Sequence, residues 1–219
     1  ACREALGLDR PAGPVFTLQP YVLMELARLA DAELPRYLTY RYRYEMFPPR
    51  RQLDAYPPLL QIEPASICNY RCVFCYQTDE SFTKPAAGHM GMMSLDTFKA
   101  VVDQAEGHID AVTLASRGEP LIARGIVPML EYLAGKFLAL KVNTNAWYLD
   151  EAKAHALLAA GVNTLVFSAD AAEEPTYSQF RVNGNLERVM KNIETFLTIK
   201  AKQYPHARTI TRVSGVKVP

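Results

Sequence analysis

Short β-rich segments alternate with longer segments of helical periodicity from residue 59 to the end of the chain. Alternation of this kind is typical of βαβ units, whose strands lie parallel in one sheet with helices packed against it. Because such crossovers are right-handed, a series of them curls into a barrel or an open wound sheet. We expect strands at 59–63, 111–115, 139–143, 164–168 and 209–218, and helices at 95–105, 126–136, 151–160 and 186–203.

Residues 1–58 precede this pattern and are interpreted as an N-terminal extension and linker. The segment 21–34 carries apolar residues at helical spacing, which predicts an amphipathic helix. The segment 37–44 combines tyrosines with arginines, which fits nucleic acid, because aromatic rings stack on bases and arginines contact phosphates. The other interpretation is an arm whose tyrosines pack on the core while its arginines stay solvated. A formal net charge of only +1 favours packing, so neither nucleic acid nor a membrane is expected as a partner.

Three of the four cysteines lie within eight residues, directly after the first expected strand. Cys68, Cys72 and Cys75 have the spacing C-x3-C-x2-C, which lets three thiolates converge on one metal centre. Three ligands neither close a tetrahedral zinc site nor saturate a four-iron cluster, so such a centre keeps an open coordination position. Two alternatives remain: a zinc site completed by a histidine or by Cys2, and a disulfide. The odd local count and the lack of any sign of secretion speak against the disulfide.

Polar and charged residues follow the later strands at the points where those strands end. In parallel βα folds, ligands bind at the carboxyl ends of the strands, so these residues are candidates for binding. A glycine permits close backbone approach, and a guanidinium has the fork of donors that suits a carboxylate ligand. Each residue could instead serve only its own turn. The candidates are Gly118, Glu119 and Pro120 after the second strand, Asn143 and Asn145 after the third, and Ser168, Asp170 and Arg181 after the fourth.

The cysteine spacing, with the aromatic Phe74 just before the last cysteine, resembles the cluster loop of radical S-adenosylmethionine (SAM) enzymes. The later turns are similar to three further motifs of that family, in the same order: G-E-P at 118–120, N-T-N at 143–145 and S-x-D at 168–170. The likeness spans about residues 59–218. It departs from the family at three positions where glycine is usual, namely Arg117, Ala146 and Ala171.

The resemblance implies a [4Fe–4S] cluster held by the three cysteines, whose fourth iron binds the amino and carboxylate groups of SAM. Glu119 would receive the SAM amino group, while Ser168 and Arg181 would hold its carboxylate. Phe74 would lie near the adenine, and the remaining motif residues would line the same site. In that family an electron from the cluster cleaves SAM to methionine and a 5′-deoxyadenosyl radical, which abstracts a hydrogen atom from a substrate.

The implied fold is an α/β, partial (β/α)6 TIM-like barrel with a helical N-terminal extension, of which this chain supplies about five βα units. The core domain would cover 59–219 and continue past Pro219, since the chain ends directly after a strand-like run. The motifs look most like the branch that often carries a C-terminal SPASM extension, whose members modify peptides, proteins or small molecules.

We therefore expect a radical SAM enzyme that acts on a peptide or small-molecule substrate, although no catalytic residue is assigned. An electron donor such as flavodoxin or ferredoxin is expected as a partner. Clustered free cysteines are typical of a reducing compartment, so a cytoplasmic location is expected. Two alternatives stay open: RNA modification with 37–44 as the RNA-binding arm, and a non-catalytic metal-binding module.

Overall fold

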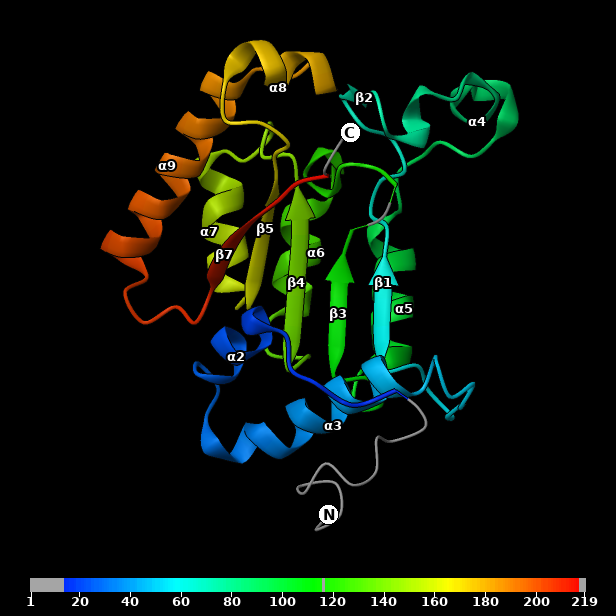
Figure 1. The fold of residues 1–219 in the computed structure, drawn as a ribbon, viewed down its shortest axis with the longest axis vertical. Coiled ribbons are helices and arrows are strands. Elements are labelled where there is room, and N and C mark those ends of the chain that lie inside the picture. The colour runs from blue at the N-terminus through cyan, green and yellow to red at the C-terminus, as the bar shows by residue number, and fades with distance from the viewer. Residues whose placement is uncertain (1–13, 116, 217–219) are drawn as a thin grey trace, which may run out of the picture.

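The structure is a computed structural model that describes residues 14–115 and 117–216 of the 219-residue chain. Its centre is a five-stranded parallel sheet with the strand order β1-β3-β4-β5-β7. Sheet neighbours follow one another in the chain, and β1 and β7 form the two edges (Figure 1). This incomplete α/β barrel confirms the expected fold class. The strands are β1 (Leu59–Ile62), β3 (Ala111–Leu114), β4 (Ala139–Thr144), β5 (Thr164–Ser168) and β7 (Ile210–Ser214).

Four helices form a layer on one face of this sheet (Figure 1). Local caps fix where they begin: the Ser94 side chain accepts a hydrogen bond from Thr97 N at 3.1 Å, and Asn185 accepts one from Arg188 N at 2.8 Å. Gly161, with a φ of 73°, follows the third helix and ends it in the left-handed region. The helices are α5 (Leu95–Ala105), α6 (Ile126–Leu133), α7 (Glu151–Ala159) and α9 (Leu186–Gln203).

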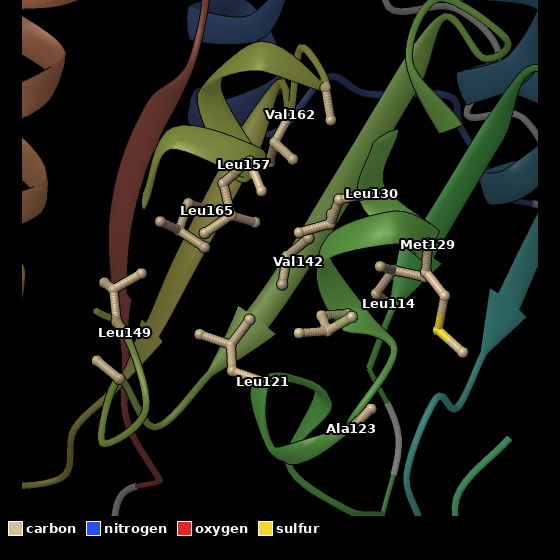
Figure 2. Packing of buried hydrophobic residues seen from close by; sticks show 14 of the residues in the cluster. Leu114, Leu121, Ala123, Met129, Leu130, Val142, Leu149, Leu157, Val162 and Leu165 are labelled. Carbon is tan, nitrogen blue, oxygen red and sulfur yellow. The ribbon is translucent and has the colours of Figure 1, made fainter. Parts of the chain in front are cut away.

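The main hydrophobic core lies between the sheet and this helical layer. Figure 2 shows Val142 and Leu165 projecting from two neighbouring strands toward Leu130 of α6 and Leu157 of α7. All four side chains are fully buried. Because strand residues alternate between faces, the odd-numbered residues of β4 point to the opposite side, into the barrel interior.

Two N-terminal helices, α2 (Pro20–Leu26) and α3 (Leu34–Met46), lie across the N-terminal ends of the strands (Figure 1). A small second core joins Val22, Tyr37 and Tyr40 to the start of β3. The single helix expected over 21–34 is wrong, because α2 ends at Leu26 and α3 begins with a proline in its first turn, where a missing N–H costs little.

The segment 37–44 is therefore helical rather than an extended arm. Two of its tyrosines pack against the core, as one of the two interpretations expected. The same interpretation placed the arginines in solvent, which is wrong for Arg41, whose side chain is only 6% exposed. Among the described helices, none combines the length and the apolar character that a membrane crossing requires.

Short elements above the carboxyl ends of the strands were not expected from the sequence. They lie at the upper edge of the sheet in Figure 1, where the arrowheads of the strands point. The two short strands pair antiparallel, which joins the cysteine loop to the segment after β5. The elements are β2 (Arg71–Cys72), α4 (Glu80–Thr83), α8 (Glu174–Phe180) and β6 (Arg181–Val182).

Candidate functional site

A pocket of about 210 Å³ opens at the carboxyl ends of the strands. Parallel strands all end at this edge, so the turns after β1, β3, β4 and β5 meet there. Pro120 and Asp170 are the two predicted site residues that do not line it. Cys2, considered above as a possible zinc ligand, lies outside the described residues. The wall is formed by Cys68, Tyr70, Cys72, Phe74, Cys75, Ala115, Arg117, Gly118, Glu119, Asn143, Thr144, Asn145, Ser168 and Arg181.

The cysteine thiols have nitrogen donors beside them. Cys68 Sγ lies 3.4 Å from Tyr70 N and 3.8 Å from Asn145 Nδ2. Cys72 Sγ lies 3.8 Å from Arg181 Nη1. Burial raises the pKa of Cys68 to about 11, and it raises the pKa of Cys72 as well. Burial therefore favours the protonated form of both thiols, while the surrounding donors suit sulfurs that become thiolates on binding metal.

Arg181 is held against the cysteine loop by several contacts. In the antiparallel pairing of β6 with β2, Arg181 lies directly opposite Cys72. Its guanidinium carbon lies 6.0 Å from the ring centre of Phe74. Arg181 Nε lies 2.6 Å from Asp170 Oδ2, and both side chains are almost completely buried. The other oxygen of Asp170 accepts a hydrogen bond from Val216 N at 2.7 Å. Asp170 thus stands behind Arg181 and would act on a ligand only through that guanidinium.

Glu119 connects the G-E-P turn to the end of β4. Its carboxylate is only 2% exposed and accepts hydrogen bonds from Leu121 N (3.0 Å), Thr144 Oγ1 (2.6 Å) and Asn145 N (2.7 Å). Burial raises the pKa of the Glu119 carboxyl, although these three donors oppose the rise. A carboxylate offers about four acceptor positions, so one remains for a donor that enters the pocket.

Gly118 is required by the close approach of two backbone segments. A β-carbon at this position would lie 1.9 Å from Ala65 O and 2.7 Å from Ile67 O, far inside van der Waals contact. The turn is also tied to the cysteine loop by a hydrogen bond from Glu119 N to Ile67 O at 2.9 Å. The predicted reason for a glycine here, close backbone approach, fits this geometry.

Glu63, directly after β1, is a site residue that the sequence analysis missed. Its Oε1 accepts hydrogen bonds from Arg117 N (2.6 Å) and Gly118 N (3.1 Å), and its Oε2 pairs with Arg117 Nη2 at 3.2 Å. Gln77 supports the same turn by donating to the backbone oxygens of Ser66 and Arg117. The sequence signal for Glu63 was the same as for the other candidates, because Glu63 also lies at the end of a strand.

The two amide side chains after β4 have different surroundings. Asn145 donates to Asn69 Oδ1 at 3.0 Å and accepts from Trp147 N at 2.9 Å, so it bridges two loops. Asn143 Oδ1 is buried and has no hydrogen-bond partner among the residues that the structure describes. An unpaired buried acceptor in a pocket wall favours a ligand that donates to it. Ala146, where the family has glycine, adopts a φ of 60°, which explains the usual preference at that position.

Comparison with known proteins identifies relatives over the same region. A family model described as the radical SAM superfamily matches residues 62–205. GTP 3′,8-cyclase from Desulforamulus reducens is 27% identical over 159 residues, which cover 72% of this chain and 47% of the relative. An AdoMet-dependent heme synthase from Methanosarcina barkeri is 30% identical over 139 residues, which cover 63% of this chain and 38% of the relative. The chain thus spans less than half the length of these two relatives.

Solved structures share the fold at low sequence identity. Streptococcus suis SuiB bound to the precursor peptide SuiA matches with a TM-score of 0.62 and 14% identity, over 100% of this chain and 45% of that one. BtrN in complex with AdoMet and 2-DOIA matches with a TM-score of 0.51 and 13% identity, over 74% of this chain and 58% of that one. The family model covers more than half of the chain, including the cysteine loop, and so this chain belongs to the radical SAM superfamily.

Proposed function

We propose that this chain is the catalytic core of a radical SAM enzyme, with a [4Fe–4S] cluster and SAM bound in the pocket at the strand ends. The observation that carries the proposal is the pocket wall itself, in which three free cysteines face the same space as Glu119 and Arg181. Membership of the family implies both cofactors. When bound, they supply the reductive cleavage of SAM and the abstraction of a hydrogen atom from a substrate.

The cysteine loop suits a four-iron cluster. Within the described ranges, no group of three or more His, Cys, Asp or Glu side chains is arranged to hold one metal ion. A four-iron cluster needs no such shared centre, because each of its thiolates binds a different iron. The donors beside Cys68 and Cys72 would stabilise sulfurs that carry the negative charge of such a cluster.

The residues opposite the cysteines suit the two ends of an amino acid. The free acceptor position of Glu119 would take a hydrogen bond from the SAM ammonium group, which would also compensate a buried carboxylate. Arg181, oriented by Asp170, would hold the SAM carboxylate with its guanidinium fork. Asn143 Oδ1 would accept a hydrogen bond from a hydroxyl group, such as those of the ribose.

The substrate is proposed to be a peptide or a small molecule, with flavodoxin or ferredoxin as electron donor and the cytoplasm as location. GTP 3′,8-cyclase and the AdoMet-dependent heme synthase are named for small molecules, and SuiB binds a precursor peptide, so both classes have support. The alternative of an RNA-binding arm at 37–44 keeps only part of its support, because Tyr37 and Tyr40 are buried and not free to stack on bases, whereas Tyr42 and Tyr44 are exposed.

Anaerobic reconstitution with iron and sulfide, followed by dithionite and SAM, tests the proposal. We expect about four irons per chain and formation of 5′-deoxyadenosine. Cys72→Ala should lose the cluster, because two thiolates do not hold four irons stably. Val73→Ala, a change at the exposed neighbouring residue, should keep it. Zinc without iron–sulfur absorbance would contradict the proposal, and so would a full iron content in Cys72→Ala.

A further inference from the structure

A second cavity lies at the opposite end of the barrel from the cysteine loop. It holds about 70 Å³, where one water molecule needs about 10–15 Å³, so a small oxyanion fits. Its floor comes from the N-terminal helices, through Tyr21, Tyr40 and Arg41. Its upper wall comes from strand residues that point into the barrel, among them Thr113, Lys141 and Arg212. The extension and the barrel thus build this cavity together.

The strand residues of this cavity share the interior face of the barrel. Thr113 pairs with Lys141 across β3 and β4. Arg212 pairs with Val166, the partner of Asn143, so it lies on the same face one step nearer the strand ends. Residues in register in a parallel sheet point to the same side. Lys141 and Arg212 therefore share the interior face, away from the helical layer.

Cationic charge is in excess around this cavity. In the described part of the chain, no ion pair involves Lys141 or Arg212. Glu25 is the one carboxylate in the described lining, and it already accepts hydrogen bonds from Thr164 Oγ1 (2.7 Å) and from Tyr37. Burial lowers the pKa of Lys141, and the nearby arginines lower it further while Glu25 raises it. The cluster of cations is thus poised for an added negative charge.

Two polar atoms in the wall also lack partners. Arg41 pairs with Glu45 through Nη2, but its Nε is buried without a hydrogen-bond partner among the described residues. Thr113 Oγ1 is also buried without a hydrogen-bond partner among the described residues, and Thr113 is only 3% exposed. Unsatisfied buried groups cost stability unless something occupies the space between them. A donor guanidinium and a hydroxyl beside two further cations match the chemistry of an oxyanion.

Lys141 and Thr113 lie one step below the cofactor pocket. On β4, Lys141 precedes Asn143 by two residues, and Thr113 of β3 precedes Ala115, the residue just after that strand, by two. Asn143 and Ala115 line the pocket of the cysteines. Two strand residues span about 7 Å, so a group held at Lys141 would lie about that far beneath the proposed SAM site.

We propose that Lys141 and Arg212, closed from below by Arg41, bind an oxyanionic group, a carboxylate or a phosphate, carried by the substrate. The oxyanion site stands on the geometry alone, whereas its assignment to the substrate rests on the proposed function. A substrate anchored there extends its remaining atoms toward the strand ends, where the hydrogen-abstracting group is generated. The N-terminal helices then serve to close the substrate chamber, which gives the extension a role in specificity.

Isothermal titration calorimetry of the reconstituted protein tests the site, with inorganic phosphate and acetate as separate probes at constant ionic strength. We expect at least one probe to bind, and Lys141→Gln and Arg212→Gln each to weaken it at least tenfold. Lys141→Arg keeps the charge and should bind within about threefold of the wild type. Lys202→Gln, a change on the exposed face of α9, is the matched control and should bind normally. Circular dichroism verifies that each variant is folded.

The outcomes separate the two parts of the inference. Selective phosphate binding indicates a phosphorylated substrate, and selective acetate binding indicates a carboxylate. No binding of either probe, or an equal loss in Lys202→Gln, overturns the site. If the wild type binds a probe through Lys141 but produces no 5′-deoxyadenosine from SAM, the site stands and its assignment to a radical SAM substrate falls.

Discussion

Replacing Gly118 by alanine tests whether the contact between the G-E-P turn and the cysteine loop determines the geometry of the site. The new β-carbon would lie 1.9 Å from Ala65 O, a backbone atom that no side-chain rotation can move. An ordinary van der Waals contact begins at 3.4 Å, so the two segments must separate by about 1.5 Å. The movement carries Glu119, the next residue, away from the cysteine loop.

The expected loss of stability follows from the contacts that this movement breaks. The hydrogen bonds from Glu119 N to Ile67 O and from Gly118 N to Glu63 Oε1 span the separating segments. Each contributes about 0.5–1.5 kcal/mol, and overpacking adds about 1–3 kcal/mol. We expect a decrease of about 2–6 kcal/mol in the free energy of unfolding. A displacement beyond 1 Å at a binding group should also weaken SAM binding at least tenfold, by about 1.4 kcal/mol or more.

Urea unfolding followed by circular dichroism measures the first effect, and titration of SAM into the reconstituted protein measures the second. Gly91→Ala is the matched control, because its β-carbon would have no atom within 4 Å. The control should change the free energy of unfolding by less than about 0.5 kcal/mol. If Gly118→Ala matches this control in both stability and SAM affinity, the reasoning about close approach is refuted.

Two further substitutions address the buried charges of the site. Asp170→Asn should lower the free energy of unfolding by about 3 kcal/mol and weaken SAM binding, because it leaves the Arg181 guanidinium buried without a counter-charge. Urea unfolding measures the loss of stability, with Asp96→Asn at an exposed position as the control. Equal stability of the two variants would contradict the prediction. Glu119→Gln should change how the free energy of unfolding depends on pH. Burial raises the pKa of Glu119 in the folded state above the ordinary value of 4.5. Between 4.5 and the raised pKa, the folded state therefore binds more protons than the unfolded state. The free energy of unfolding of the wild type should therefore decrease as the pH rises from 4.5 through the raised pKa. Urea unfolding across the same pH range should show no decrease of this origin in Glu119→Gln.

The strands and helices of the barrel could be predicted because their signals are local. The segments 95–105, 164–168 and 186–203 match α5, β5 and α9 residue for residue. The two helices begin at side-chain caps, Ser94 and Asn185, which act within three residues of the chain. The prediction of one helix at 21–34 was wrong because the end of α2 is not fixed by a local signal. The apolar spacing continues past Leu26, and the break before α3 depends on packing against the strand ends.

The candidate site was predictable as a set of residues but not as a set of contacts. Strand ends meet at one edge in any parallel sheet, so the cysteines, Glu119 and Arg181 could be placed together from the sequence. The ion pair between Asp170 and Arg181 bridges a turn and a short strand whose positions no local pattern fixes. Which side of β4 Lys141 faces likewise depends on register, and a shift by one residue would bury it among the helices.

Arg117 stands where the family usually has a glycine, and the packing of the turn explains why an arginine is tolerated there. A sequence motif with two adjacent glycines does not say which of them the backbone requires. In this structure the requirement belongs to Gly118, whose β-carbon would collide with the cysteine loop. The Arg117 side chain is instead half exposed at the edge of the pocket, where it pairs with Glu63 and lies 5.1 Å from the ring centre of Phe82. The arginine therefore preserves the turn, because it replaces a glycine that close approach does not demand and adds an ion pair that a glycine lacks.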